Sequence, residues 1–69
     1  MIKYTLRNVN QVIGYYKYVH FWQDEENDNI IEILGSDVFD PPIAHASTVD
    51  IARARFEWDK NVEQGFKRI

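Results

Sequence analysis

The sequence contains no cysteine, one methionine and two histidines among its 69 residues. Disulfide bonds are therefore excluded, and few side chains are available to hold a structural metal ion. A chain of this length forms one domain, residues 1–69, and buries roughly 60% of the surface that its unfolded form exposes. Its stability consequently depends on one thin hydrophobic core.

Long apolar runs are also missing from the sequence. No stretch approaches the ~18 consecutive apolar residues that a membrane-spanning helix needs. The N-terminal residues, MIKYTLRNVNQ, lack the apolar segment and the small-residue cleavage site of a signal peptide. Together with the lack of cysteine, these features predict a cytoplasmic protein without a membrane partner.

Basic residues are absent from the middle of the chain. Residues 24–50 contain eight acidic residues and neither lysine nor arginine, whereas residues 1–23 contain three basic residues and no acidic one. The net charge of −3 therefore hides a strong segregation of charge along the sequence. A protein that binds the phosphate backbone presents a basic stripe, so this pattern disfavours nucleic acid and leaves an acidic surface for a basic partner.

Three apolar stretches predict β-strands. Residues 2–7 alternate apolar and polar side chains, which is typical of a half-buried edge strand. Residues 12–22 are rich in β-branched and aromatic residues and predict a long central strand. After the polar loop at 23–29, residues 30–35 predict a third strand. The simplest arrangement of the three is an antiparallel β-meander.

The C-terminal third has the periodicity of a helix. Ser47 or Thr48 can cap it, and Asp50 lies in its first turn, where a carboxylate suits the helix dipole. Gly65 is placed to end the helix in a left-handed conformation, and Phe66 returns to the core. The apolar stripe between these ends consists of Ile51, Ala54, Trp58 and Val62. We therefore predict an α+β fold, a three-stranded antiparallel β-meander packed by one C-terminal α-helix.

Residues 54–68, ARFEWDKNVEQGFKR, carry a resemblance to known sequences. They are similar to the ends of short proteins of unknown function from cyanobacteria and their phages, which close with Ala-Arg, Trp, an aliphatic pair, Gly, an aromatic and a basic residue. The matching residues are Ala54, Arg55, Trp58, Val62, Gly65, Phe66 and Arg68. Asn61 replaces the first aliphatic residue, and the match covers about a fifth of the chain. The resemblance implies a small phage or cyanobacterial accessory protein and carries over no activity.

Half of the ten aromatic residues lie between Tyr15 and Trp22. Alternate side chains of a strand share a face, and one helix covers only one face of a sheet. We expect one set to face Trp58 and Val62 of the helix, namely Val19, Phe21, Ile31 and Ile33. The uncovered face then presents a row of Tyr16, Tyr18, His20 and Trp22.

This aromatic row and its neighbour Lys17 are the predicted partner-binding residues. Tyrosine and tryptophan are enriched at binding hot spots because they bury a large rigid area and keep a polar tip. A homodimer anchored by Tyr18 and Trp22 is one way to cover the row, because the same patch is then buried on both copies. Two alternatives stay open: residues 38–46 fold over the row and bury it, or the two faces are reversed.

A second predicted surface is the acidic loop, whose carboxylates are Asp24, Glu25, Glu26 and Asp28. Their spacing superficially resembles a calcium-binding loop. Asn29 stands where that loop needs glycine, however, and Gly35 stands where it needs a bidentate glutamate. The loop is therefore predicted to be a solvated acidic surface and not a metal site.

Catalysis is the last class to consider. His20 and His45 could pair with Asp37 or Asp40, but no nucleophile lies in a recognisable turn and no third group orients a base. We predict no catalytic residue, no metal and no cofactor. The preferred function is a non-enzymatic interaction module, a regulatory or inhibitory phage-type protein that binds a larger host protein or a second copy of itself. The alternative is a single-stranded nucleic-acid binder that stacks bases on the aromatic face.

Overall fold

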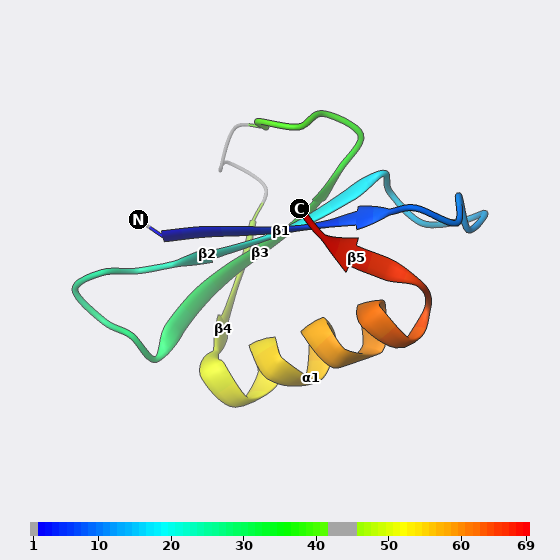
Figure 1. The fold of residues 1–69 in the computed structure, drawn as a ribbon. Coiled ribbons are helices and arrows are strands. Elements are labelled where there is room, and N and C mark those ends of the chain that lie inside the picture. Colours follow the sequence, from blue (N-terminus) through cyan, green and yellow to red (C-terminus); the bar gives the residue numbers. More distant parts are fainter. Residues whose placement is uncertain (1, 42–45) are drawn as a thin grey trace.

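The computed structural model describes residues 2–41 and 46–69. Its elements are β1 (Ile2–Asn8), β2 (Tyr18–Gln23), β3 (Ile30–Ser36), β4 (Ser47–Asp50), α1 (Ile51–Glu63) and β5 (Phe66–Arg68). The strands form one antiparallel sheet in the order β4-β3-β2-β1-β5. The fold is therefore α+β, and its helix connects the two edge strands, β4 and β5, along the chain (Figure 1). No helix in the described ranges is long and apolar enough to cross a membrane.

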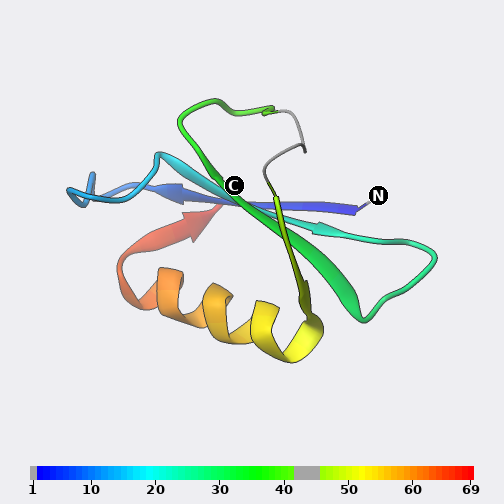
Figure 2. The same ribbon diagram turned by 180° about the vertical axis from the view of Figure 1, so that it is seen from behind.

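Helix α1 crosses one face of the sheet from edge to edge. It begins directly after β4 and leads into β5, which lies at the opposite edge. Its 13 residues span about 20 Å at roughly 1.5 Å per residue, which is close to the ~19 Å between the first and fifth strands of such a sheet. Figures 1 and 2 show the helix on one side of the sheet and the chain after β3 arching over the other side.

The predicted three-stranded meander is wrong, because two short strands extend the sheet at its edges. β4 consists of STVD, which we expected to start the helix, and β5 consists of FKR. Strands of four and three residues are too short to show an alternating pattern. Each forms on an edge that the longer strands leave unpaired, β4 on residues 30–33 and β5 on residues 6–8. β1 is therefore an internal strand and not the predicted edge.

The central strand is shorter than predicted, because β2 begins at Tyr18 and not at residue 12. The Asn8 carboxamide accepts a hydrogen bond from the Val12 N–H (3.0 Å) and donates one to the Val12 carbonyl (3.2 Å). Gln11 and Gly14 adopt φ values of 50° and 90°, which turn the backbone out of an extended path. These local bonds compete with sheet pairing, so the β-forming composition of residues 12–17 does not decide their structure.

Both ends of α1 have defined caps. Asp50, and not Ser47 or Thr48, is the N-cap, and its Oδ1 accepts a hydrogen bond from the Arg53 N–H (2.8 Å). Gly65 follows the helix with φ of 101°, which confirms the predicted left-handed stop. The carboxamide of Asn10 lies against Gly65, so a side chain there would also collide with the loop after β1.

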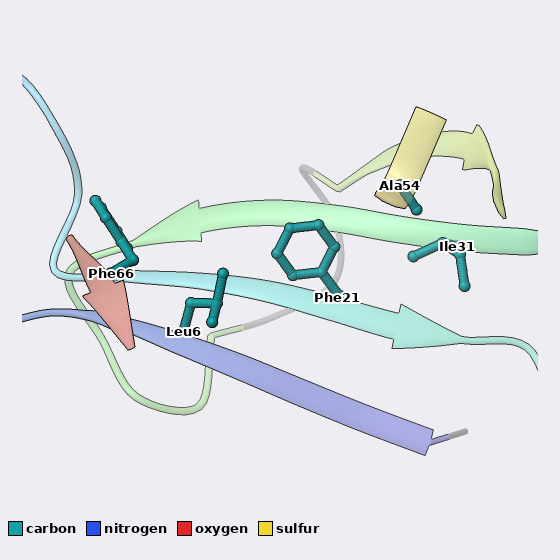
Figure 3. Packing of buried hydrophobic residues seen from close by; sticks show 5 residues of the cluster. All are labelled: Leu6, Phe21, Ile31, Ala54 and Phe66. Atoms are coloured by element: carbon teal, nitrogen blue, oxygen red, sulfur yellow. The ribbon is translucent and has the colours of Figure 1, made fainter. Parts of the chain in front are cut away.

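The core lies between the sheet and α1. Its buried side chains are Leu6, Phe21, Ile31, Ala54 and Phe66 (Figure 3). The predicted inward set is confirmed, since Val19 and Ile33 pack against this cluster together with Trp58. Val62, by contrast, is exposed on the last turn of the helix. Phe66 reaches the core as predicted, because β5 pairs with β1 directly above the helix end.

Candidate interaction site

The face of the sheet opposite α1 carries three stacked aromatic rings, Tyr18, His20 and Trp22, which we call the ladder. The ring centroids are 6.0 Å apart between Tyr18 and His20 and 5.7 Å apart between His20 and Trp22. The rings share a face because they are alternate residues of β2. The sequence therefore predicts the ladder itself correctly from Tyr18 onward.

The expectation that this face is open is wrong, and the first of the two alternatives left open by the sequence is supported in the described residues: residues 37–41, here called the strap, lie over the ladder. Phe39 contacts Tyr18 edge-on with centroids 5.6 Å apart, and the Lys3 ammonium lies 5.6 Å from the Trp22 ring centroid. His20 and Trp22 keep only 1% and 3% of their surface exposed. Covering the rings removes a large apolar area from water, which is the physical reason for this outcome. Trp22 is consequently not available as an anchor for a partner.

Hydrogen bonds as well as apolar contacts hold the strap on the ladder. His20 Nε2–H donates to the Val38 carbonyl (3.4 Å), and the Thr5 hydroxyl donates to His20 Nδ1 (3.0 Å). A carbonyl can only accept, so these bonds identify the tautomer protonated on Nε2. Burial lowers the pKa of His20; the Val38 carbonyl and Asp40 partly oppose this effect, and Lys3 adds to it. Both ring nitrogens are thus engaged, which leaves this residue poorly placed for acid–base catalysis.

Two of the predicted partner-binding residues lie apart from the ladder. Tyr16 precedes β2, is 57% exposed, and its ring lies against Gly35. Gly35 pairs with Val19, whose side chain points toward the helix, so Tyr16 belongs to the helix face of the sheet. Lys17 is exposed, and its backbone N–H donates to Asp37 Oδ1 (3.1 Å). The change of face arises because the extended strand starts only after these two residues.

The acidic loop joins β2 to β3. Asp24 Oδ1 accepts a hydrogen bond from the Glu26 N–H (2.9 Å), and Asn27 Oδ1 accepts one from the Asn29 N–H (3.2 Å). Glu25, Glu26 and Asp28 are exposed. Within residues 2–41 and 46–69, no group of three or more histidine or acidic residues is arranged to hold a metal ion. His45, the other histidine considered as a base, lies outside the described residues.

The helix face contains a groove that sequence reasoning missed. It has a volume of about 270 Å³. We call it the helix-side groove, and its lining residues are Tyr4, Phe21, Gln23, Ile31, Ile51, Ala54, Arg55, Trp58 and Arg68. Its floor is aromatic, since the Trp58 ring meets Phe21 and Tyr4 edge-on with centroids 5.1 and 6.5 Å apart.

The groove exists because a single helix cannot cover a five-stranded sheet. α1 packs mainly on β3, β4 and β5. In Figures 1 and 2 the hairpin formed by β2 and β3 reaches past the first turn of the helix. Tyr4, the cross-strand partner of Phe21, is therefore only partly roofed by Trp58, whereas Phe21 is buried in the core.

Two arginines line this groove with no carboxylate partner among the described residues. The Arg68 guanidinium lies 5.2 Å from the Tyr4 ring centroid, and Arg55 comes from the helix. Arg53, in contrast, binds Glu57 at 2.7 Å. The spacing of Arg55 and Trp58, three positions apart on one helix, is the sequence signal that could have placed both at one site.

Comparisons of this sequence and structure with protein-family models, curated proteins and solved structures give no match. The candidate site is therefore argued from its own geometry. Of the surfaces described above, the ladder is covered at His20 and Trp22, whereas the helix-side groove leaves Tyr4 and Trp58 partly exposed beside two arginines.

Proposed function

We propose that this protein is a small non-enzymatic interaction module that binds another protein chain in the helix-side groove. The observation that carries the proposal is a groove in which two partly exposed aromatic rings, Tyr4 and Trp58, lie beside two arginines that have no carboxylate partner among the described residues. Aromatic and arginine side chains are the types most enriched at the energetic centres of protein interfaces. A module of this kind acts by occupying a surface of its partner, as a regulatory or inhibitory protein does.

The size of the groove favours a side chain over a cofactor as the occupant. Sites for small molecules usually enclose about 300–1,000 Å³, and the groove, with about 270 Å³, lies below that range. An apolar side chain projecting from a protein surface would fill it and exclude water from Trp58. Carboxylates next to that side chain would form charge-assisted hydrogen bonds with the arginines.

The nucleic-acid alternative receives less support. Base stacking needs exposed ring faces, and His20 and Trp22 present almost none. The Tyr18 ring is stacked on His20 on one side and contacted by Phe39. The aromatic face that suggested this alternative is therefore occupied by the protein itself.

Photo-crosslinking tests the proposal, because it captures whichever protein lies in the groove. A benzophenone amino acid replaces Gln23, which lines the groove, and in a matched control it replaces Lys60, which is exposed on the helix and does not line it. Both proteins are irradiated in a lysate of the source organism, with and without nuclease. We expect a covalent product with protein, resistant to nuclease, at position 23 and not at position 60. The proposal fails if position 23 gives no protein product, or if its product disappears with nuclease.

A further inference from the structure

The rim of the helix-side groove carries opposite charges side by side. Gln23, the last residue of β2, lines the groove, and the acidic loop begins at the next residue, Asp24. Arg55 and Arg68 line the same groove. Acidic and basic groups therefore belong to one contiguous surface, although the sequence places them more than 25 residues apart.

An exposed apolar side chain lies beside this surface. Ile2 is 43% exposed and is the cross-strand partner of Gln23. Directly paired residues of a sheet point to the same face, so Ile2 lies on the helix face next to the groove. Tyr4, two residues further along β1, is part of the groove floor. The surface thus contains an aromatic hollow and, beside it, a projecting aliphatic group.

We propose that the occupant of the groove is a second copy of this chain, bound about a two-fold axis. A two-fold interface brings the same patch of both copies together, so a patch that carries both halves of a complementary pair matches itself. Ile2 of each copy enters the groove of the other, and the acidic loop of each copy faces Arg55 and Arg68 of the other. This inference rests on the proposed function, because it names the protein that the groove binds.

The energetics favour such a pairing over a free groove. A domain of this size without a disulfide has little core, and a partner that covers the groove adds buried apolar area to it. Arginine and carboxylate form bidentate, charge-assisted hydrogen bonds that also set the orientation of the two copies. Glu26 and Asp28 are exposed on the loop and can supply these carboxylates.

Complementary charge reversal tests the two-fold pairing. Sedimentation velocity on the purified chain over a concentration series should show a dimer. The groove variant Arg55→Glu/Arg68→Glu and the loop variant Glu26→Lys/Asp28→Lys should each weaken dimerisation by about 100-fold or more, because like charges then face each other. An equimolar mixture of the two variants should restore the dimer, because both halves of the interface are complementary again.

A charge-matched control separates the specific contact from general attraction. The groove variant lowers the net charge from −3 to −7, and the loop variant raises it to +1. The variant Asp59→Lys/Glu63→Lys also has a net charge of +1, but its substitutions lie on exposed helix positions outside the groove. Its own interface is intact, so it should form a homodimer, but in a mixture it should not bring the groove variant into a mixed dimer. Circular dichroism of every variant first establishes that it is folded.

The outcomes distinguish this inference from the proposed function. A parent chain that stays monomeric at 1 mM, a dimer that survives both charge reversals, or a mixture that does not reassemble overturns the two-fold pairing. If crosslinking from position 23 then yields a heavier product than two copies of the chain, the groove binds a different protein and the proposed function stands. If position 23 yields no protein product either, both ideas fail together.

Discussion

On one face of the sheet a regular helix packs across the strands, and on the other face a short irregular segment, the strap, covers the aromatic ladder. The helix is a rigid cylinder, so it leaves part of β1 and β2 unroofed and a groove remains. The strap can follow the contour of the rings, and it contacts Tyr18 and the almost completely buried His20. In this protein the regular helix therefore leaves the helix-side groove beside it, whereas the irregular strap covers the ladder.

The backbone of the strap needs hydrogen-bond partners from outside the segment, which the helix does not. A helix satisfies most of its own backbone groups, but a strap must find partners for them elsewhere. The Val38 N–H donates to Ser36 Oγ (2.9 Å), and the Val38 carbonyl accepts from His20. This explains why a histidine stands between a tyrosine and a tryptophan in the ladder. It has the flat shape of an aromatic ring and also donates the hydrogen bond that holds the strap.

The largest difference between the faces should appear when each tryptophan is truncated. Trp22→Ala should lower the free energy of unfolding by about 3–5 kcal/mol, because the ring is almost completely buried. Trp58→Ala should lower it by about 2 kcal/mol, because part of the ring already faces the open groove. Urea unfolding followed by circular dichroism measures both values.

Phe56→Ala provides the control for this comparison, since Phe56 is exposed on the helix and its loss should change stability little. If Trp22→Ala does not fold, the Trp22→Phe and Trp58→Phe pair gives the same comparison with smaller effects. A larger loss at Trp58 than at Trp22 would mean that the strap contributes less to stability than the helix face.

The elements that could be predicted from the sequence are those whose pattern is local and repeated. The alternation in residues 2–7, the helical stripe around Ala54 and Trp58, and the glycine stop at Gly65 all depend on neighbours within one element. β4 and β5 could not be predicted in this way. Each exists because the sheet offers it an unpaired edge, and that edge forms only after distant strands have paired.

The candidate site could not be predicted from the sequence for a related reason. The ladder follows from alternation along β2, but its exposure depends on where the strap lies, and the sequence pattern does not show that His20 binds the Val38 carbonyl of this distant segment. The groove is built by Tyr4, Phe21, Trp58 and the two arginines, which come from four different elements. Only the pair Arg55 and Trp58 is close in sequence, and a pair of this kind is common on packed helices.

A smaller, pH-dependent effect should be confined to the strap side. Burial lowers the pKa of His20, so the folded protein binds this proton less readily than the unfolded chain does, despite the opposing effects of Asp40 and the Val38 carbonyl. The stabilisation is therefore fully present above the ordinary histidine pKa of about 6.5, and it is lost as the pH falls from there through the lowered pKa.

Unfolding free energies of the parent and of His20→Gln, measured between pH 7.5 and pH 5, test this expectation. The parent should lose more stability over the interval than the variant, because only the parent must charge the buried His20 ring, whose pKa is lowered by burial. Identical slopes would show that His20 accepts a proton without disturbing the strap.

The smallest effect is expected from the ion pair that joins the strap to β1. Lys3 Nζ lies 3.5 Å from Asp40 Oδ1, and the two side chains are 56% and 78% exposed. Exposed pairs of this kind contribute about 0–1 kcal/mol, and Lys3 would keep its contact with the Trp22 ring if its partner were removed.

Asp40→Asn should therefore change the free energy of unfolding by less than about 0.5 kcal/mol and leave Trp22 protected from acrylamide quenching. The Trp58→Phe background isolates the fluorescence of Trp22 for this measurement. A clear rise in quenching would mean that the Lys3–Asp40 ion pair holds the strap on the ladder, and not the packing of Phe39 and the His20 hydrogen bond. In that case 1 M salt should also expose Trp22 in the Trp58→Phe variant that keeps Asp40.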